Sequence, residues 1–488
     1  MRLPPFRALL LFLLPSLSLL AVEPSEGAKN VPINTTLSWA AVPGAKAYEV
    51  YFGETKPVFQ CRVFKPTFLL ETLSAGKTYH WRVDVVPEGG QTKLGDIQKF
   101  TTAANPDRDA MFAWSIRIAK SLHGLYPKPE DLKGWNYTEG MMLDGLYAIA
   151  TRTGRDADFD YIRAWLDRFV GADGAIDPKA YPPKYYSLDR VRPGPVLLWI
   201  YGRTKDERYR KAANQLIQQL DEQPHTSDGG FWHRSTYPNQ MWLDGIYMAD
   251  VFAAQYAARL DQPKYANLAV HQITTIYRHT HDPKSGLFYH GWDETKTRPW
   301  ANKETGTSPE FWGRAVGWYG MAMADVLDWL PLDHPGRKKI LPIFQAYCAA
   351  VLKYQDRDTG MWFQILDKPT APQNYTETSC SLMFAYAMTR GVQRGWLDAE
   401  YLEHARRATR GVLNHQVELL PGDRMDIHGT VNVGTLAGDG GFYASYMRDK
   451  IVTNDNKSIG AFMFLSMALS ETANDTGPAS REFPKWEP

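Results

Sequence analysis

The stretch Gln240-Met241-Trp242-Leu243-Asp244-Gly245-Ile246-Tyr247-Met248 opens a long apolar segment and carries one carboxylate, Asp244, where hydrocarbon would continue the pattern. We expect a helix here, in which Met241, Tyr247 and Met248 lie three or four positions from Asp244 and share its face. Aromatic and thioether neighbours exclude water and favour the protonated form of a carboxyl group. Asp244 is therefore the candidate proton donor. The alternative is a solvated residue in the first helical turn, stabilised by the helix dipole.

Apolar residues recur every three or four positions from Asp107 onward, as in amphipathic helices. No run typical of a strand separates the periodic segments. The pattern therefore predicts an all-α domain of six helical hairpins over residues 107–475. The expected helices begin near Asp109, Thr138, Asp156, Tyr186, Asp206, Gln240, Gln262, Pro309, Gly336, Glu377, Asp398 and Lys457.

Three loops in this region share one pattern, a glycine followed by apolar or aromatic residues and then a polar side chain. They are 227–233, 285–290 and 359–364, and each follows an expected helix. Equivalent loops would surround one concavity, with the insertions 222–239 and 280–308 as its walls. The alternative is that these glycines only permit tight turns.

The segment 24–103 differs from the rest because short alternating runs are separated by Pro and Gly turns. Strands are expected over 36–41, 47–52, 79–86 and 97–102, which indicates a small β-sandwich. The run from Leu73 to Val83 resembles the tyrosine corner of fibronectin type III domains, and Trp39 takes the place of their core tryptophan. We interpret this part as an accessory module, either a sugar-binding domain or a spacer packed on the main domain.

The charge balance excludes partners that need a strong field. With 55 basic and 54 acidic residues, the chain has no basic patch for nucleic acid or for a membrane surface. Aromatic residues make up 13% of the chain, including 16 Trp and 26 Tyr, and their flat rings suit the faces of sugars.

The first residues have the pattern of a signal peptide. Arg2 and Arg7 precede an apolar run over 8–21 that is too short to span a membrane. We therefore expect residues 1–21 to direct export to the periplasm or the medium, with no membrane association after cleavage. The three cysteines lack metal-ligand spacing, so neither a disulfide framework, a zinc site nor another cofactor is expected.

Several motifs in 107–475 occur together at characteristic positions. They are Trp135-Asn136-Tyr137, Tyr186-Ser187-Leu188-Asp189, His233 eleven residues before Asp244, Gln240-Met241-Trp242-Leu243-Asp244-Gly245, Tyr289-His290-Gly291-Trp292, the segment 308–318 with Trp312, Arg314 and Trp318, and Glu377-Thr378-Ser379. With these motifs the region resembles the unsaturated rhamnogalacturonyl hydrolases, glycoside hydrolase family 105, and more distantly the unsaturated glucuronyl hydrolases. The resemblance implies an (α/α)6 barrel.

The resemblance also implies an activity. These enzymes remove a Δ4,5-unsaturated uronic acid from the non-reducing end of oligosaccharides that lyases produce. The residue matching Asp244 acts as a general acid. The double bond is hydrated: a proton goes to C4, water adds at C5, and the hemiketal opens and expels the aglycone.

Roles for the other matched residues follow from the resemblance and from their chemistry. Asp189 is the second conserved carboxylate, His233 and His290 donate to hydroxyls or orient water, and Arg314 offers a planar fork to the substrate carboxylate. The expected substrate-binding set is completed by Trp135, Asn136, Gln240, Trp312 and Trp318.

One further carboxylate competes with Asp244. The segment 142–147, with Asp144 at its centre, repeats the pattern of 242–247 one hundred positions earlier. We prefer Asp244 because only it has His233 and Gln240 upstream, and we place Asp144 near the rim as a residue of the repeat. Two other functions stay open, a polysaccharide lyase on a similar helical toroid and a non-catalytic carbohydrate-binding protein.

Overall fold

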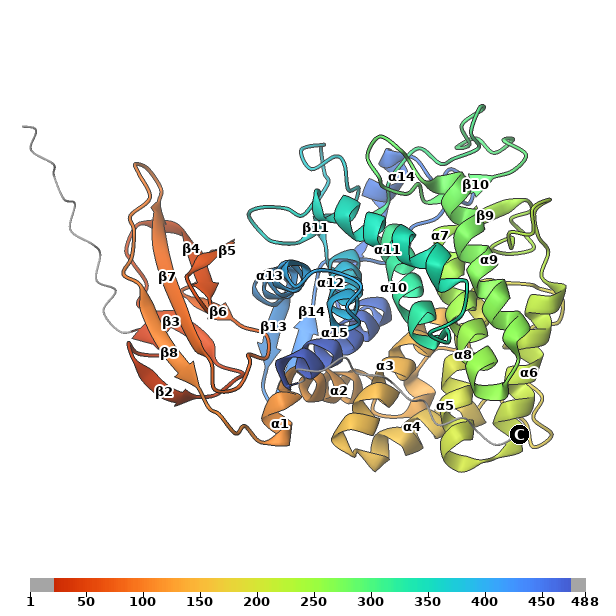
Figure 1. Cartoon of the computed structure of the whole chain (residues 1–488), viewed down its shortest axis with the longest axis horizontal. Helices are drawn as coiled ribbons and strands as arrows, with labels where there is room; N and C mark the ends of the chain where they lie inside the picture. Colours follow the sequence, from red (N-terminus) through yellow and green to blue (C-terminus); the bar gives the residue numbers. More distant parts are fainter. Residues whose placement is uncertain (1–21, 475–488) are drawn as a thin grey trace, which may run out of the picture.

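The computed structural model describes residues 22–474, as a β-domain followed by a helical domain (Figure 1). The expected signal peptide and the C-terminal tail lie outside the described residues. Within 22–474, no helix is long and apolar enough to cross a membrane.

The β-domain consists of two sheets around one apolar core that includes Trp39 and Trp81. One sheet has the order β1-β3-β6 and the other β2-β8-β7-β4-β5. The hydroxyl of Tyr79 accepts a hydrogen bond from the backbone N–H of Ser74 at 3.0 Å, five residues upstream. The strands are β1 (Val22–Glu23), β2 (Ala28–Val31), β3 (Thr36–Trp39), β4 (Ala45–Gly53), β5 (Val58–Val63), β6 (Thr67–Leu69), β7 (Thr78–Pro87) and β8 (Gln98–Thr102). The four expected strands correspond to β3, β4, β7 and β8, and the other four were not predicted because most of them are too short to show an alternating pattern.

The helical domain is a ring of six inner helices enclosed by outer ones. Neighbouring inner helices pack in the closed order α3, α5, α8, α10, α12, α15 and back to α3. The longer helices are α2 (Ala113–Leu125), α3 (Tyr137–Thr153), α4 (Asp156–Asp167), α5 (Gly194–Thr204), α6 (Glu207–Glu222), α8 (Val251–Leu260), α9 (Pro263–Thr280), α10 (Gly313–Trp329), α11 (Arg337–Leu352), α12 (Thr378–Gln393), α13 (Glu400–His415) and α15 (Asn456–Asn474). Short helical pieces are α1 (Arg108–Met111), η1 (Pro129–Asp131), η2 (Leu188–Arg190), α7 (Leu243–Gly245), η3 (Ile246–Asp250) and α14 (Tyr443–Arg448).

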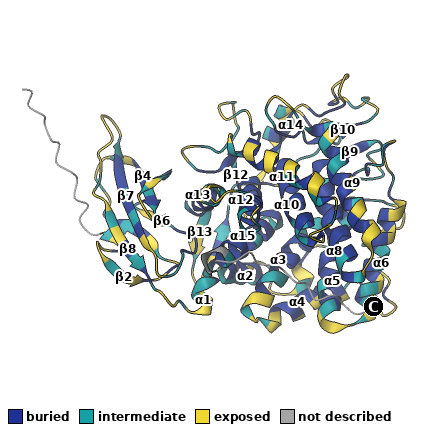
Figure 2. Cartoon of the chain, in the orientation of Figure 1, coloured by how far each residue is buried: buried dark blue, intermediate teal, exposed yellow. Residues whose placement is uncertain are grey.

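Inner helices of the ring are surrounded by protein, whereas outer helices have one face in solvent, and their sequences differ accordingly. Nearly every residue of α10 and α12 is buried, whereas α6 and α13 bury one face and expose a charged one (Figure 2). Close packing of α10 on α11 needs Gly320, because a Cβ atom there would lie 2.1 Å from the Tyr347 hydroxyl oxygen. The predicted twelve helices are therefore present, although the strands between them were not expected.

Four short pairs of strands interrupt the helices on the side where the inner helices begin. They pair β9 (Gln240–Trp242) with β10 (Gly291–Asp293), β11 (Trp362–Phe363) with β12 (Thr376–Glu377), β13 (Val417–Leu420) with β14 (Arg424–Ile427), and β15 (Thr430–Val431) with β16 (Ile451–Val452). Strands of two to four residues carry too little periodicity to be recognised in a sequence.

Two helix starts were predicted wrongly. Residues 240–242 form strand β9, so Met241 does not share a helical face with Asp244, and a π-helical turn over 246–250 follows. The helix expected near Tyr186 begins at Gly194, because Tyr186 has a left-handed backbone (φ 45°) and Pro193 directly precedes the first turn.

The three glycine loops follow α6, α9 and α11, at the end of the barrel where the inner helices begin. Gly229, Gly286 and Gly360 all have positive φ, between 76° and 85°. Both expectations for these loops therefore hold: they belong to one rim, and their glycines serve tight turns.

The two domains are joined by a buried ion pair. Glu71, which follows strand β6, accepts hydrogen bonds from Arg410 of α13 at 2.6 and 2.7 Å, and both side chains are at most 2% exposed. The side-chain amide of Asn414 both donates to and accepts from the backbone of Leu69, at 2.9 and 2.8 Å. Strand β6 lies at the edge of its sheet, so Asn414 satisfies backbone groups that an edge would leave unpaired.

Glu71→Gln should destabilise the protein by about 3–5 kcal/mol, because it leaves the buried Arg410 guanidinium without a counter-charge. Chemical denaturation followed by circular dichroism measures this loss. Glu403→Gln is the matched control, since the exposed Glu403 carboxylate lies 4.0 Å from the same guanidinium and its loss should cost less than about 1 kcal/mol. Equal stability of the two variants would contradict the role of the buried pair.

Candidate active site

Asp244 lies at the point where strand β9 turns into the helical stretch that ends in α8. The backbone N–H of Leu243 donates to the carbonyl of His290 at 3.0 Å, which brings the two segments side by side. The Nε2 atom of His290 lies 3.1 Å from Oδ2 of Asp244, whose side chain is 15% exposed. A carboxyl group and an imidazole thus form a pair at the rim of the barrel.

His290 is fully buried, and this burial lowers the pKa of its imidazole below the ordinary value. It is therefore neutral at pH 7 and has one N–H. Its Nδ1 atom lies 2.6 Å from the hydroxyl of Tyr446, which is also fully buried. If Tyr446 donates to Nδ1, the N–H of His290 is on Nε2, the atom nearer to Asp244, and the reverse arrangement leaves Nε2 free to accept a proton.

Asp189, in the 3₁₀ turn η2, has a different environment. Its carboxylate lies 2.6 Å from Nη2 of Arg234 and 3.4 Å from Nε2 of His233. Burial alone would raise the pKa of Asp189, but these two partners lower it to about 2. Asp189 is therefore ionised at neutral pH and accepts hydrogen bonds, which leaves Asp244 as the better placed proton donor.

Three aromatic rings form a stack beside the carboxyl groups. The Trp242 ring stacks with both His233 and Tyr237, with ring centroids 4.6 and 4.8 Å away and nearly parallel planes. The edge of Trp242 also contacts His290. Sequence reasoning did not select Trp242 or Tyr237, although Trp242 stands within the motif of Asp244.

Arg314 and Trp312 support the site from beneath. The Arg314 guanidinium donates to the backbone carbonyl of Val431 and lies over the Trp312 ring, 4.6 Å from its centroid. Both side chains are at most 2% exposed, and Trp312 in turn stacks on Tyr446. In this structure Arg314 fixes the segment that carries Tyr446, and its fork does not project into an open cleft.

The other expected substrate-binding residues are two polar residues, Asn136 and Gln240, and two tryptophans, Trp135 and Trp318. Asn136 is half-buried at the start of α3, and Gln240 is buried in β9, where its side chain accepts from the Trp242 indole at 3.2 Å. Trp135 has no exposed surface and stacks on Trp165, so it belongs to the core. Trp318 is 1% exposed and stacks on Tyr247.

Asp144 does not lie near the rim, contrary to our expectation. It sits in the middle of α3, where Arg192 and the Trp199 indole each donate to its carboxylate at 2.8 Å. The residues around Asp144 repeat the local pattern of Asp244. Asp244, however, lies at a helix start and therefore at the rim, whereas Asp144 lies within a helix and therefore inside the barrel.

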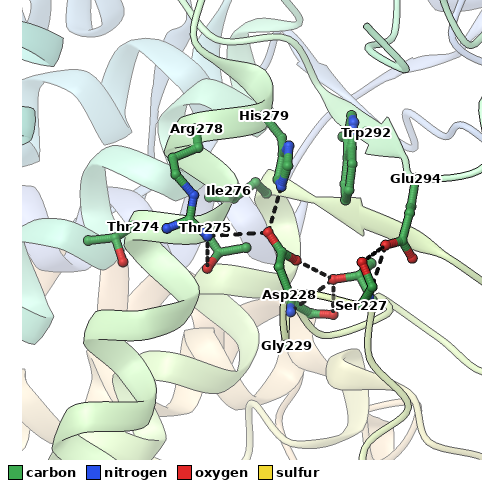
Figure 3. Close-up of polar contacts among 12 residues, drawn as sticks. Ser227, Asp228, Gly229, Thr274, Thr275, Ile276, Arg278, His279, Trp292 and Glu294 are labelled. Carbon is green, nitrogen blue, oxygen red and sulfur yellow. Dashed lines mark hydrogen bonds and ion pairs between the residues drawn. The ribbon is translucent and has the colours of Figure 1, made fainter.

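The wall formed by 222–239 is fastened to α9 and β10 (Figure 3). Asp228 contacts His279 at 2.8 Å and Arg278 at 3.2 Å, while Ser227 donates its backbone N–H to Glu294 at 2.9 Å. The His279 ring stacks on Trp292, with centroids 3.6 Å apart. Because His233 and Arg234 belong to this wall, these contacts hold the partners of Asp189 in place.

The helical ring and the polar, aromatic rim fit a carbohydrate-active protein, and the family match identifies the class as a glycoside hydrolase. Residues 114–473 match the family model described as Glycosyl Hydrolase Family 88, and the chain belongs to this family.

Known relatives agree with this assignment. A family 105 glycoside hydrolase from C. acetobutylicum ATCC 824 superimposes with a TM-score of 0.71 at 35% identity, over 74% of this chain and 99% of that one. The unsaturated rhamnogalacturonyl hydrolase YesR of Bacillus subtilis is 25% identical over 280 residues, 56% of this chain and 75% of YesR. The unsaturated glucuronyl hydrolase of Bacillus sp. GL1 has the same fold, with a TM-score of 0.54 at 13% identity over 74% of this chain and 94% of that one. The predicted barrel and enzyme class are confirmed.

Tyr446→Phe should lower kcat about 10-fold and leave KM within two-fold, because it removes one hydrogen bond that sets the tautomer of His290 while keeping the ring on Trp312. The measurement uses an unsaturated uronyl disaccharide, the substrate type that the sequence resemblance implies, over a range of pH. Tyr443→Phe is the control in the same helix, since the Tyr443 hydroxyl donates to Pro372 at the surface. An unchanged pH profile of kcat in Tyr446→Phe would contradict the role of Tyr446.

Proposed function

We propose that the enzyme removes a Δ4,5-unsaturated uronic acid from the non-reducing end of lyase-generated oligosaccharides by hydrating the C4=C5 double bond. The observation that carries this proposal is the different surroundings of the two carboxyl groups. Asp189 is bound by Arg234 and His233, which hold it ionised, whereas Asp244 lies 3.1 Å from the imidazole of His290 at the rim, where it can serve as the single proton donor. Direct hydrolysis of a glycosidic bond commonly uses two carboxyl groups that exchange a proton or form a covalent bond, whereas hydration of a vinyl ether needs one acid and one water.

The proposed steps balance in atoms and charge. Asp244 transfers its proton to C4, and C5 becomes an oxocarbenium ion. Water adds at C5 and returns a proton to the Asp244 carboxylate, so the enzyme is regenerated. The resulting hemiketal opens at the C5–O5 bond to a C5 ketone, and the hemiacetal left at C1 collapses to an aldehyde and releases the aglycone as an alcohol. His290, 3.1 Å from Asp244, orients this carboxyl group, and the ionised Asp189 accepts hydrogen bonds from sugar hydroxyls.

The names of the relatives support this class of substrate. Besides YesR, an unsaturated 3S-rhamnoglycuronyl hydrolase of Formosa agariphila is 28% identical over 182 residues, 36% of this chain and 47% of that protein. Both names contain an unsaturated uronyl group and rhamnose. The proposal is therefore the unsaturated uronyl group itself, joined to a rhamnose-containing or glycosaminoglycan-type aglycone.

The remaining parts of the chain fit a protein that acts outside the cytoplasm. We propose that residues 1–21 direct export, on the pattern of their sequence. The β-domain resembles a fibronectin type III domain through the Tyr79–Ser74 hydrogen bond and the buried Trp39. Because Glu71 and Asn414 connect it to α13, we propose that it is a packed spacer rather than a freely moving sugar-binding module.

A set of lyase products separates this function from the alternatives. With unsaturated oligosaccharides from rhamnogalacturonan, ulvan and glycosaminoglycans, we expect a loss of the ultraviolet absorbance of the double bond in at least one set. A lyase would instead create that absorbance from intact polymer. Binding of the oligosaccharides without any change in absorbance would indicate a non-catalytic carbohydrate-binding protein.

Asp244→Asn should lower kcat by a factor of at least about 10² to 10⁴, the usual contribution of general acid catalysis. The reason is that the Asn amide keeps the shape of the side chain but donates no proton to carbon. In heavy water the wild-type reaction should place deuterium at C4 of the released sugar, detected by NMR spectroscopy. A product without deuterium at C4 would refute hydration.

Asp144→Asn is the control for this variant. It should keep kcat per folded molecule, although its stability should fall because Arg192 is fully buried beside Asp144. Thermal unfolding of both variants therefore accompanies the kinetics. A loss of kcat in folded Asp144→Asn equal to that in Asp244→Asn would remove the distinction between the two carboxylates.

A further inference from the structure

The barrel contains a cavity of about 430 Å³ at the end opposite the catalytic rim. We call it the basal cavity. Its walls come from all six inner helices, and the residues used below are Asp144, Tyr147, Trp199, Gln255, Asp325 and Tyr386. Gln255 follows Asp244 by eleven residues in one helical stretch, which places it roughly 16 Å further along the axis. The cavity is therefore separate from the Asp244–His290 pair.

One side of the cavity presents a fixed hydrogen-bond acceptor. The Asp144 carboxylate receives one hydrogen bond from Arg192 and one from the Trp199 indole, both at 2.8 Å. Arg192 is completely buried and balances the charge of Asp144. Each carboxylate oxygen has a second lone pair, so Asp144 still has the capacity to accept hydrogen bonds from a ligand hydroxyl.

Gln255 presents a donor that has no protein partner. Its side chain is 1% exposed, and its amide nitrogen makes no hydrogen bond within residues 22–474. A buried polar group left unpaired costs about 1–3 kcal/mol, so a donor kept in this state indicates an acceptor supplied from outside the chain.

The third polar group is the Asp325 carboxyl, which accepts from the Tyr386 hydroxyl at 2.6 Å. Burial raises the pKa of Asp325 to about 7, so the protonated form of this group is present at neutral pH. A protonated carboxyl both donates and accepts hydrogen bonds, which suits a hydroxyl group.

Much of the rest of the wall is apolar, although Thr151, Arg152, Arg390 and Glu471 also line the cavity. Tyr147 and Trp199 stack with centroids 5.1 Å apart, and Val251 and Phe464 continue the surface. The arginines around the cavity are paired: Arg192 with Asp144, Arg152 with Glu471 at 3.3 Å, and Arg390 with Asp328 and Glu471. An uncharged ligand with an apolar face and hydroxyl groups matches this lining, and its volume is within the range of small-molecule pockets.

We propose that the basal cavity is a second binding site and that it takes an uncharged monosaccharide. The hydroxyl groups of one pyranose ring donate to Asp144 and accept from Gln255, and its C–H face lies on the aromatic wall. Sugar binding in the basal cavity requires no reaction at Asp244, so this proposal can be tested independently of the proposed hydrolysis.

The test is isothermal titration calorimetry of the full chain with L-rhamnose, D-galactose, D-glucose and D-xylose. We expect at least one of these sugars to bind with a single site per chain. Gln255→Leu should weaken that binding about 10-fold, the equivalent of one hydrogen bond. Ala148→Phe, which introduces a ring at the cavity wall, should abolish it.

Asp244→Asn is the control, because it should keep the same sugar affinity within two-fold. Thermal unfolding of each variant tests whether it is folded. If Gln255→Leu does not fold, sugar binding by Ala148→Phe decides the test. The proposal is overturned if none of the four sugars binds, or if the folded cavity variants bind as tightly as the wild type. Loss of binding in Asp244→Asn would place the sugar at the catalytic rim instead.

Discussion

The structure of the site depends on the pairing of two short strands that lie about fifty residues apart in the chain. Strand β9 pairs with β10, and the hydrogen bond from Leu243 to the carbonyl of His290 continues this pairing into the helix start. The pairing fixes Asp244 and His290 at 3.1 Å. The Asp244 carboxyl group thus lies against a neutral imidazole, whereas Asp189 and Asp144 each lie against a guanidinium.

The three carboxylates show how one residue type takes three roles. Asp189 lies between a guanidinium and an imidazole and is an ionised acceptor. Asp144 is bound to a buried guanidinium in a helix interior and faces a cavity. Asp244 faces the rim beside His290, which Tyr446 contacts from the far side. The surroundings of each group, more than its sequence motif, decide whether it can deliver a proton.

The β-domain and the barrel form one packed unit. Glu71 and Arg410 are both withdrawn from water, and neither charge would be tolerated there without the other. The connection is far from the catalytic rim, on the side of α13 (Figure 1). This connection fixes the position of the β-domain relative to the barrel. The residues of the candidate site all belong to the barrel.

The sequence by itself determined the helical domain, the enzyme class and the identity of Asp244, Asp189, His233 and His290 as neighbours in one motif set. Helical periodicity and motif spacing are local properties, and a single chain displays them directly. Only the tertiary structure decided that Gln240 is in a strand, that Trp135 lies in the core, that Arg314 binds backbone carbonyls, and that Tyr446 reaches His290. These contacts join residues far apart in the chain, or depend on strands too short to have a period. Asp144 and Asp244 share one local pattern, so nothing in that pattern could assign one to the cavity and the other to the rim. The physical reason is that a side chain's partners and its exposure to water are set by how elements pack, whereas the local sequence shows only the periodicity of the longer elements.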